Sequence, residues 1–236
     1  MNKKLISNIC IAFFIIVFLF SSYKIFNIVM DYKKGQDTYT QILEDNTNNS
    51  QDIDFDKLSK INSEIVGWLI VDGTNISYPI VQGINNEYYL THLFNGEKNP
   101  SGCIFLDYKN SKDFSDKHSV IYGHNMKDDT MFGQLEKFKD EEFYKNNKTM
   151  TIITPEKEYI VDIFAGYVTD TMDEIWQIEF DNSNFEDWLN NIIKKSYFES
   201  EIKPSKDDKI ITLATCSVES NDSRFVLVGK IRNDKY

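Results

Sequence analysis

The hydrophobic and polar positions divide the chain into three parts. Apolar residues dominate from Ile9 to Met30, with one brief polar interruption. The next segment, residues 31–52, is polar and rich in Asn, Asp, Gln and Thr. After it come short apolar runs separated by Gly, Pro, Asn and Asp, which is typical of strands joined by turns. We therefore expect a membrane span in residues 1–30, a polar stalk in residues 31–52 and one folded domain in residues 53–236.

The N-terminal apolar stretch is long enough to cross a membrane. A helix needs roughly 20 residues to span the hydrocarbon core, and Leu5–Ile25 provides them. A cleaved signal peptide is the alternative, but no Ala-x-Ala-like cleavage site follows Phe20, so we expect a retained anchor. Because Lys3 and Lys4 precede the span, the N-terminus is expected in the cytoplasm and the domain outside the cell membrane, with a single pass between them.

The folded domain is expected to be mostly β. Phe55, Leu58 and Ile61 have helical spacing and predict a short helix at its start. Eight strand-like runs follow: Ile65–Val71, Ile76–Val81, Cys103–Leu106, Ser119–Tyr122, Met150–Ile153, Tyr159–Val168, Ile210–Ala214 and Phe225–Ile231. Eight strands are typical of a closed or nearly closed barrel.

One longer helix is predicted between the sixth and the seventh strand. Its apolar residues form one stripe at helical spacing: Phe185, Trp188, Leu189, Ile192 and Ile193. We expect this stripe to pack against the barrel rather than to bind a partner.

Composition and charge exclude several classes of function. The formal net charge is -11, whereas a nucleic-acid-binding protein needs a basic surface, so we expect no nucleic-acid partner. The sequence has no His-x-x-x-His or Cys-x-x-Cys pair and no glycine-rich phosphate-binding motif. We therefore expect neither a metal site nor a cofactor.

The chain has three cysteines, and their settings differ. Cys10 lies inside the membrane span, where a thiolate would be desolvated. Cys103 begins an apolar strand and is expected to be a small buried thiol. Cys216 ends an apolar strand and opens into the polar loop Ser217–Ser223, where a substrate can reach it. A disulfide between Cys103 and Cys216 remains an alternative at this point.

The three histidines also differ in setting. His92 lies among aromatic residues and is expected to be packed, whereas His118 follows charged residues and is expected to be solvated. His124 follows Gly123 at the end of a predicted strand, and we expect this glycine to let the backbone turn there. His124 is therefore the best candidate for a catalytic base.

Three motifs of the domain are similar to the active-site segments of one enzyme family. Ile121–Met126 reads Ile-Tyr-Gly-His-Asn-Met, Thr212–Cys216 reads Thr-Leu-Ala-Thr-Cys, and Arg224 opens the last strand. In this order and spacing they resemble the sortases. The segment after Met126 and the helix around Trp188 point to class B of that family. The resemblance covers the chain from about Phe55 to its C-terminus.

The resemblance implies an eight-stranded sortase barrel and a cysteine transpeptidase. It assigns Cys216 as the nucleophile, His124 as the proton donor and Arg224 as the group that stabilises the oxyanion or orients the substrate. The donor would be a surface protein with a C-terminal sorting signal cleaved after Thr, and class B enzymes prefer motifs like Asn-Pro-x-Thr. The acceptor would be an amine of Gram-positive peptidoglycan.

The substrate contacts follow less directly from the motifs. Thr215, Ser217 and Asn125 flank the catalytic candidates and are the expected substrate-binding residues, although a strand threonine also packs well through its methyl group. Ser217 departs from the acidic residue that class B relatives often carry, so we do not assign the first residue of the sorting motif.

Two other functions remain open on the sequence. The domain could be a membrane-tethered adhesion or binding module in which Cys103 and Cys216 form a structural disulfide. It could also be a cysteine endopeptidase that hydrolyses its acyl-enzyme.

Overall fold

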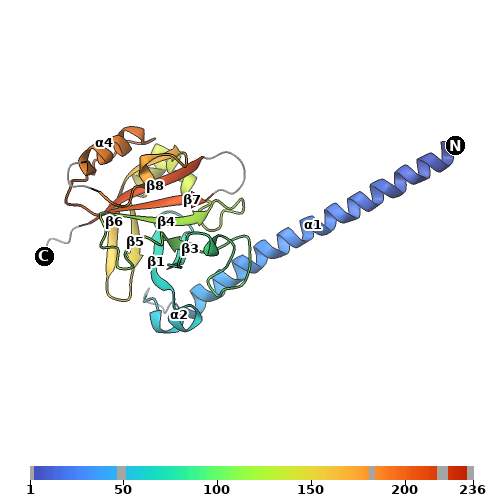
Figure 1. Cartoon of the computed structure of the whole chain (residues 1–236), viewed down its shortest axis with the longest axis horizontal. Coiled ribbons are helices and arrows are strands. Elements are labelled where there is room, and N and C mark those ends of the chain that lie inside the picture. The colour runs from blue at the N-terminus through green and yellow to red at the C-terminus, as the bar shows by residue number, and fades with distance from the viewer. Residues whose placement is uncertain (1–2, 47–51, 181–183, 217–222, 233–236) are drawn as a thin grey trace.

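Eight strands form a closed barrel in the order β1-β2-β3-β4-β7-β8-β6-β5 (Figure 1). The computed structural model describes residues 3–46, 52–180, 184–216 and 223–232, but not the side chains of Leu5 and Cys216. The strands are β1 Ile65–Val71, β2 Ser77–Val81, β3 Ile104–Leu106, β4 His118–His124, β5 Thr149–Ile153, β6 Glu158–Thr169, β7 Ile210–Cys216 and β8 Arg224–Ile231. The predicted eight-stranded barrel is confirmed.

The helices lie around and beside this barrel. They are α1 Lys3–Asn46, α2 Phe55–Ile61, α3 Glu141–Asn146 and α4 Phe185–Lys195, with short 3-10 turns η1 Tyr88–Leu90, η2 Leu135–Lys139 and η3 Glu174–Trp176. α4 follows β6 and precedes β7, as the apolar stripe predicted. Its buried residues are Phe185, Trp188, Leu189 and Ile192, whereas Ile193, which was also expected to pack, is exposed.

Strand β7, which ends at Cys216, is buried on both faces. In β7, Ile211 and Leu213 belong to the main core, whereas Ile210 and Ala214 belong to a second cluster that includes the four buried residues of α4. Successive side chains of a strand point to opposite faces, so a strand that is covered on both sides is apolar throughout. This explains why apolar residues occupy neighbouring positions, Ile210–Ile211 and Leu213–Ala214, in the strand that ends at Cys216.

Two strand pairs of the barrel are parallel, and the other pairs are antiparallel. β2 pairs with β3 and β4 pairs with β7 in parallel, whereas β8 pairs with β7 and β6 in the antiparallel direction. As a result β4 and β7 end at the same end of the barrel, where β8 begins. This end is where the candidate catalytic residues lie.

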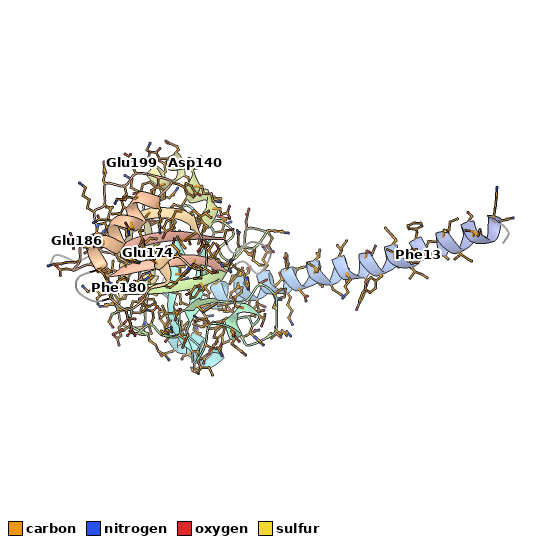
Figure 2. All side chains as sticks on the ribbon, turned by 45° about the horizontal axis from the view of Figure 1, so that its top comes forward. Phe13, Asp140, Glu174, Phe180, Glu186 and Glu199 are labelled. Atoms are coloured by element: carbon orange, nitrogen blue, oxygen red, sulfur yellow. The ribbon has the colours of Figure 1, made fainter. Side chains whose placement is uncertain are left out.

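The first part of α1 projects away from the barrel. Its apolar side chains are exposed, and Phe13 lies on this projecting part (Figures 1 and 2). By length and composition the helix could cross a membrane, and a signal sequence near the N-terminus has the same properties. The structure is therefore compatible with an anchor or a signal sequence.

The second part of α1 differs from the polar stalk expected in residues 31–52, of which residues 47–51 lie outside the described ranges. The helix continues without a break to Asn46, and Gly35, Tyr39, Ile42 and Asn46 are buried. These positions recur every three or four residues and form one face of the helix. Such a narrow face needs few apolar residues, so the mostly polar composition of the segment gave no sign that the helix packs against the barrel. The folded unit thus includes this part of α1.

His118 is buried, which corrects the expectation that it is solvated. It opens β4, and its ring is fully covered and lies against Trp188 of α4, with the ring centroids 4.8 Å apart. Nδ1 donates to the Gln177 carbonyl oxygen at 2.7 Å, and Nε2 accepts from the Thr212 hydroxyl at 2.7 Å. The ring therefore ties the segment before α4 to both strands that lead to the site.

Acidification is predicted to weaken the fold through His118. Burial lowers the pKa of His118 to about 4, whereas an unfolded histidine titrates near 6.5. The stability that neutral His118 contributes is present above pH 6.5 and is lost as the pH falls from 6.5 to 4, up to about 3 kcal/mol. We expect this loss in guanidinium unfolding of the full-length chain in detergent, and a shallower pH dependence in His118→Gln. An identical pH dependence in both proteins would contradict the role of His118.

Candidate active site

The strand register brings the three catalytic candidates to one end of the barrel. In the parallel pair β4–β7, the backbones of His124 and Cys216 are direct partners. In the antiparallel pair β7–β8 the last partners are Ala214 and Val226, two residues before Cys216 and two residues after Arg224. Three neighbouring strands thus carry the three candidates at one end of the barrel.

A backbone carbonyl group fixes the imidazole of His124. The residue is only 9% exposed, and Nε2 lies 2.7 Å from the carbonyl oxygen of Leu90 at the end of η1. A carbonyl oxygen only accepts, so Nε2 carries the hydrogen of this bond. The tautomer and the orientation of the ring are therefore set by the loop between β2 and β3.

Gly102, from the same loop, packs against the His124 ring and was missed by the sequence analysis. Its φ is +60°, a conformation that glycine adopts at little cost. A Cβ atom at this position would lie 2.5 Å from the Tyr89 carbonyl oxygen and 3.1 Å from Cδ2 of His124. Only glycine fits here without displacing the loop or the imidazole. The signal in the sequence was a glycine directly before the buried Cys103.

Gly123 is needed for space and not for a turn, which corrects the sequence interpretation. It lies within β4, and its φ is not positive. A Cβ atom there would lie 2.4 Å from Cδ1 of Ile104 and 2.8 Å from the ring of Phe132. The missing side chain lets these core residues pack directly beneath the strand that carries His124.

Arg224 places a permanent positive charge at this end of the barrel. It opens β8, its backbone pairs with Thr169 of β6, and it is half-buried. Nη1 donates to the carbonyl oxygen of Ser223 at 3.1 Å. A guanidinium group stays protonated at all relevant pH values, so this cation is available to an oxyanion or a substrate carbonyl group.

The expected substrate-binding residues have different outcomes. Thr215 is 2% exposed, and its hydroxyl accepts from the backbone N–H of Phe225 at 3.1 Å, which argues against a contact with substrate. Asn125 is exposed next to His124, and its Nδ2 donates to Glu136 at 3.0 Å. Ser217 lies outside the described residues. Asn125 and Ser217 therefore remain predictions, whereas Thr215 joins β7 to β8.

Cys103 is a free, buried thiol, as expected from its apolar surroundings. Burial raises the pKa of Cys103 to about 12, so its thiolate is scarce at neutral pH. Because Cys103 is unpaired, the structure contradicts the binding module with a Cys103–Cys216 disulfide.

The other histidines, cysteines and acidic residues in the described ranges do not form a second catalytic or metal site. His92 stacks on the ring of Tyr88 with the centroids 4.0 Å apart, which fits the expectation of a packed histidine. Within the described ranges, no three His, Cys, Asp or Glu side chains gather in an arrangement that could hold a metal ion.

Comparisons with known proteins agree with this fold. The sortase domain family matches residues 69–232. Sortase B of Listeria monocytogenes is 38% identical over 91% of this chain and 92% of its own. The structure of a Staphylococcus aureus sortase B–substrate complex is similar with a TM-score of 0.77 and 29% identity, covering 87% of this chain and 100% of that one. Sortase B of Clostridium perfringens has a TM-score of 0.71 and 37% identity, covering 76% and 100%.

The barrel and its relatives define a cysteine transpeptidase. The chain belongs to the sortase family, and its similarity to sortase B proteins over most of its length places it in class B. The resemblance of the three sequence motifs to this class is therefore confirmed at the level of the family.

Alkylation is predicted to distinguish the two cysteines of the domain. In a Cys10→Ala background, iodoacetamide at neutral pH without reductant should label Cys216 and spare Cys103, because burial raises the pKa of Cys103 to about 12. Peptide mass spectrometry measures both sites, and unfolding in guanidinium should make both reactive. Equal labelling of the two thiols in the folded protein would contradict the assignment.

Proposed function

We propose that this sortase transfers surface proteins to an amine of peptidoglycan, with Cys216, His124 and Arg224 as its catalytic residues. The observation that carries the proposal is the pairing of His124 with Cys216 across β4 and β7, with β8 beginning at Arg224. A nucleophile, a proton carrier and a fixed cation are the three parts that acyl transfer requires.

The first step forms a thioester. The thiolate of Cys216 attacks the carbonyl carbon of the threonine in the sorting signal, and the carbonyl oxygen becomes an oxyanion. The permanent charge of Arg224 stabilises this oxyanion or holds the substrate backbone. As the tetrahedral intermediate collapses, the amide C–N bond breaks and the leaving amine takes a proton from His124.

The second step transfers the acyl group to the acceptor. An amino group of the peptidoglycan attacks the thioester carbon, His124 takes the proton of that amine, and the Cys216 thiolate leaves. Because the Nε2 hydrogen of His124 is held by the Leu90 carbonyl, we assign both proton transfers to Nδ1.

The donor is a protein with a C-terminal sorting signal. Class B relatives favour motifs like Asn-Pro-x-Thr, and a related structure is a complex of sortase B with a substrate. Asn125 is exposed beside His124 and is our candidate contact, together with Ser217 and its loop. The departure at Ser217 leaves the first residue of the preferred motif unassigned.

We infer that α1 anchors the enzyme in the cell membrane. Its apolar first part could span a bilayer, and Lys3 and Lys4 favour a cytoplasmic N-terminus with the barrel outside. The intact mass of the protein isolated from membranes distinguishes the two cases, because a retained anchor leaves the full-length chain and a cleaved signal sequence leaves a shorter one.

Substitution of the catalytic residues is predicted to separate chemistry from folding. Cys216→Ala should abolish formation of the acyl-enzyme, and Arg224→Ala should lower kcat/KM by about 100-fold or more while the circular dichroism spectrum is retained. Chromatographic assays with a sorting-signal peptide and an amine acceptor measure the rates. A Cys216→Ala variant that still cleaves the peptide would contradict the assignment of Cys216 as the nucleophile.

The acceptor dependence is predicted to exclude the endopeptidase alternative. A transpeptidase resolves its thioester with an amine, so omission of the acceptor should slow turnover by about 10-fold or more. Turnover at the full rate with water alone would instead identify a cysteine endopeptidase. The ratio of transfer product to hydrolysis product at increasing acceptor concentration is the measurement.

A further inference from the structure

We propose that Tyr39, on the docked part of α1, is a positioning residue for His124. The inference rests on the proposed function, because it takes His124 to be the proton carrier. The side chain of Tyr39 acts through the two backbone segments that flank the imidazole.

The first connection runs through Gly102. The Tyr39 hydroxyl donates to the Gly102 carbonyl oxygen at 2.7 Å, and the side chain is 7% exposed. Gly102 has a positive φ and packs so closely on Cδ2 of His124 that a Cβ atom would be 3.1 Å away. The hydrogen bond of Tyr39 therefore fixes the peptide unit that forms one wall for the imidazole.

The same hydrogen bond also holds in place the Leu90 carbonyl group that accepts the hydrogen bond of His124. The backbone N–H of Cys103 donates to the Tyr89 carbonyl oxygen at 2.9 Å, which ties the end of the loop to η1. The next carbonyl group along the chain, that of Leu90, accepts from Nε2 of His124 at 2.7 Å. A shift of Gly102 would thus move the group that orients the imidazole.

The second connection runs through Tyr78 to the turn after His124. The rings of Tyr39 and Tyr78 meet edge to face, with the centroids 5.2 Å apart. The Tyr78 hydroxyl accepts from the backbone N–H of Met131 at 3.1 Å, and Met131 pairs with Asn125. In the next pair of this turn, Phe132 donates to the carbonyl oxygen of His124 itself at 2.9 Å.

The fit of α1 against the loop makes Tyr39 effective. A Cβ atom on Gly35, one turn earlier, would lie 2.7 Å from Oγ of Ser101, so the helix backbone lies directly on the loop. Nδ2 of Asn99 donates to the Asp31 carbonyl oxygen at 2.8 Å. A cavity of about 200 Å³ borders the rings of Tyr39 and Tyr78. The two tyrosines thus lie where α1, the loop and the turn after His124 come together.

The test compares two Tyr→Phe variants of the full-length chain in detergent. Tyr39→Phe removes the hydroxyl that holds Gly102 and keeps the ring. Tyr159→Phe is the matched control, because its hydroxyl also donates to a backbone carbonyl oxygen, that of Asp113, at 2.7 Å. Tyr159 lies at the start of β6, roughly 30 Å along the strand from Thr169, the partner of Arg224.

We expect a split between kcat and KM. Tyr39→Phe should lower kcat for transpeptidation by about 10-fold and leave KM for the sorting peptide within about twofold, because a displaced proton carrier slows the chemical steps. Tyr159→Phe should keep kcat within about twofold of the wild type. Thermal unfolding of both variants measures how much stability each loses. If the hydroxyl of Tyr39 were only structural, the two variants would lose similar stability and keep similar kcat.

His124→Ala separates the possible failures. If His124→Ala keeps the wild-type kcat, the proposed function fails and the inference fails with it. If His124→Ala is inactive but Tyr39→Phe and Tyr159→Phe have the same kcat, only the inference is overturned. A lower kcat in Tyr39→Phe alone, with KM unchanged, supports the positioning role.

Discussion

The parallel pairing of β4 with β7 is the constraint on which the site depends. Parallel strands end at the same edge, so the backbones of His124 and Cys216 are neighbours although they are far apart in sequence. β8 runs back beside β7 and therefore starts at this edge with Arg224. Burial of both strand faces fixes the register, because a slip by one residue would exchange the inner and outer apolar sets.

Backbone groups outside the barrel strands complete the site. The carbonyl oxygen of Leu90 sets the tautomer of His124, and Gly102 provides the close wall that no other residue could form. These groups belong to the loop between β2 and β3, which α1 covers through Tyr39. One helix, α1, thus carries the apolar N-terminal segment and also packs against the loop beside the imidazole.

The strands and α4 could be predicted because their apolar patterns are local and strong. The catalytic candidates could be found because few cysteines and histidines are present and because the motifs resemble a known family. The docking of α1 could not be predicted, since its buried face includes Gly35 and Asn46, which do not look apolar. The buried state of His118 was missed because its partners, Gln177 and Thr212, are distant in sequence. The packing of Thr215 between β7 and β8 was missed for a related reason. Alternation along a strand that is covered on both faces does not show which face contacts substrate.

In the proposed mechanism, the thiol of Cys216 carries the acyl group between donor and acceptor. Mass spectrometry of the intact chain, quenched during turnover of a sorting-signal peptide, detects this acyl-enzyme. We expect an adduct with the mass of the donor fragment that ends at threonine, mapped by peptide analysis to Cys216 and removed by an amine acceptor. An adduct on Cys103, or turnover without any covalent adduct under conditions that trap thioesters, would show that Cys216 is not the nucleophile.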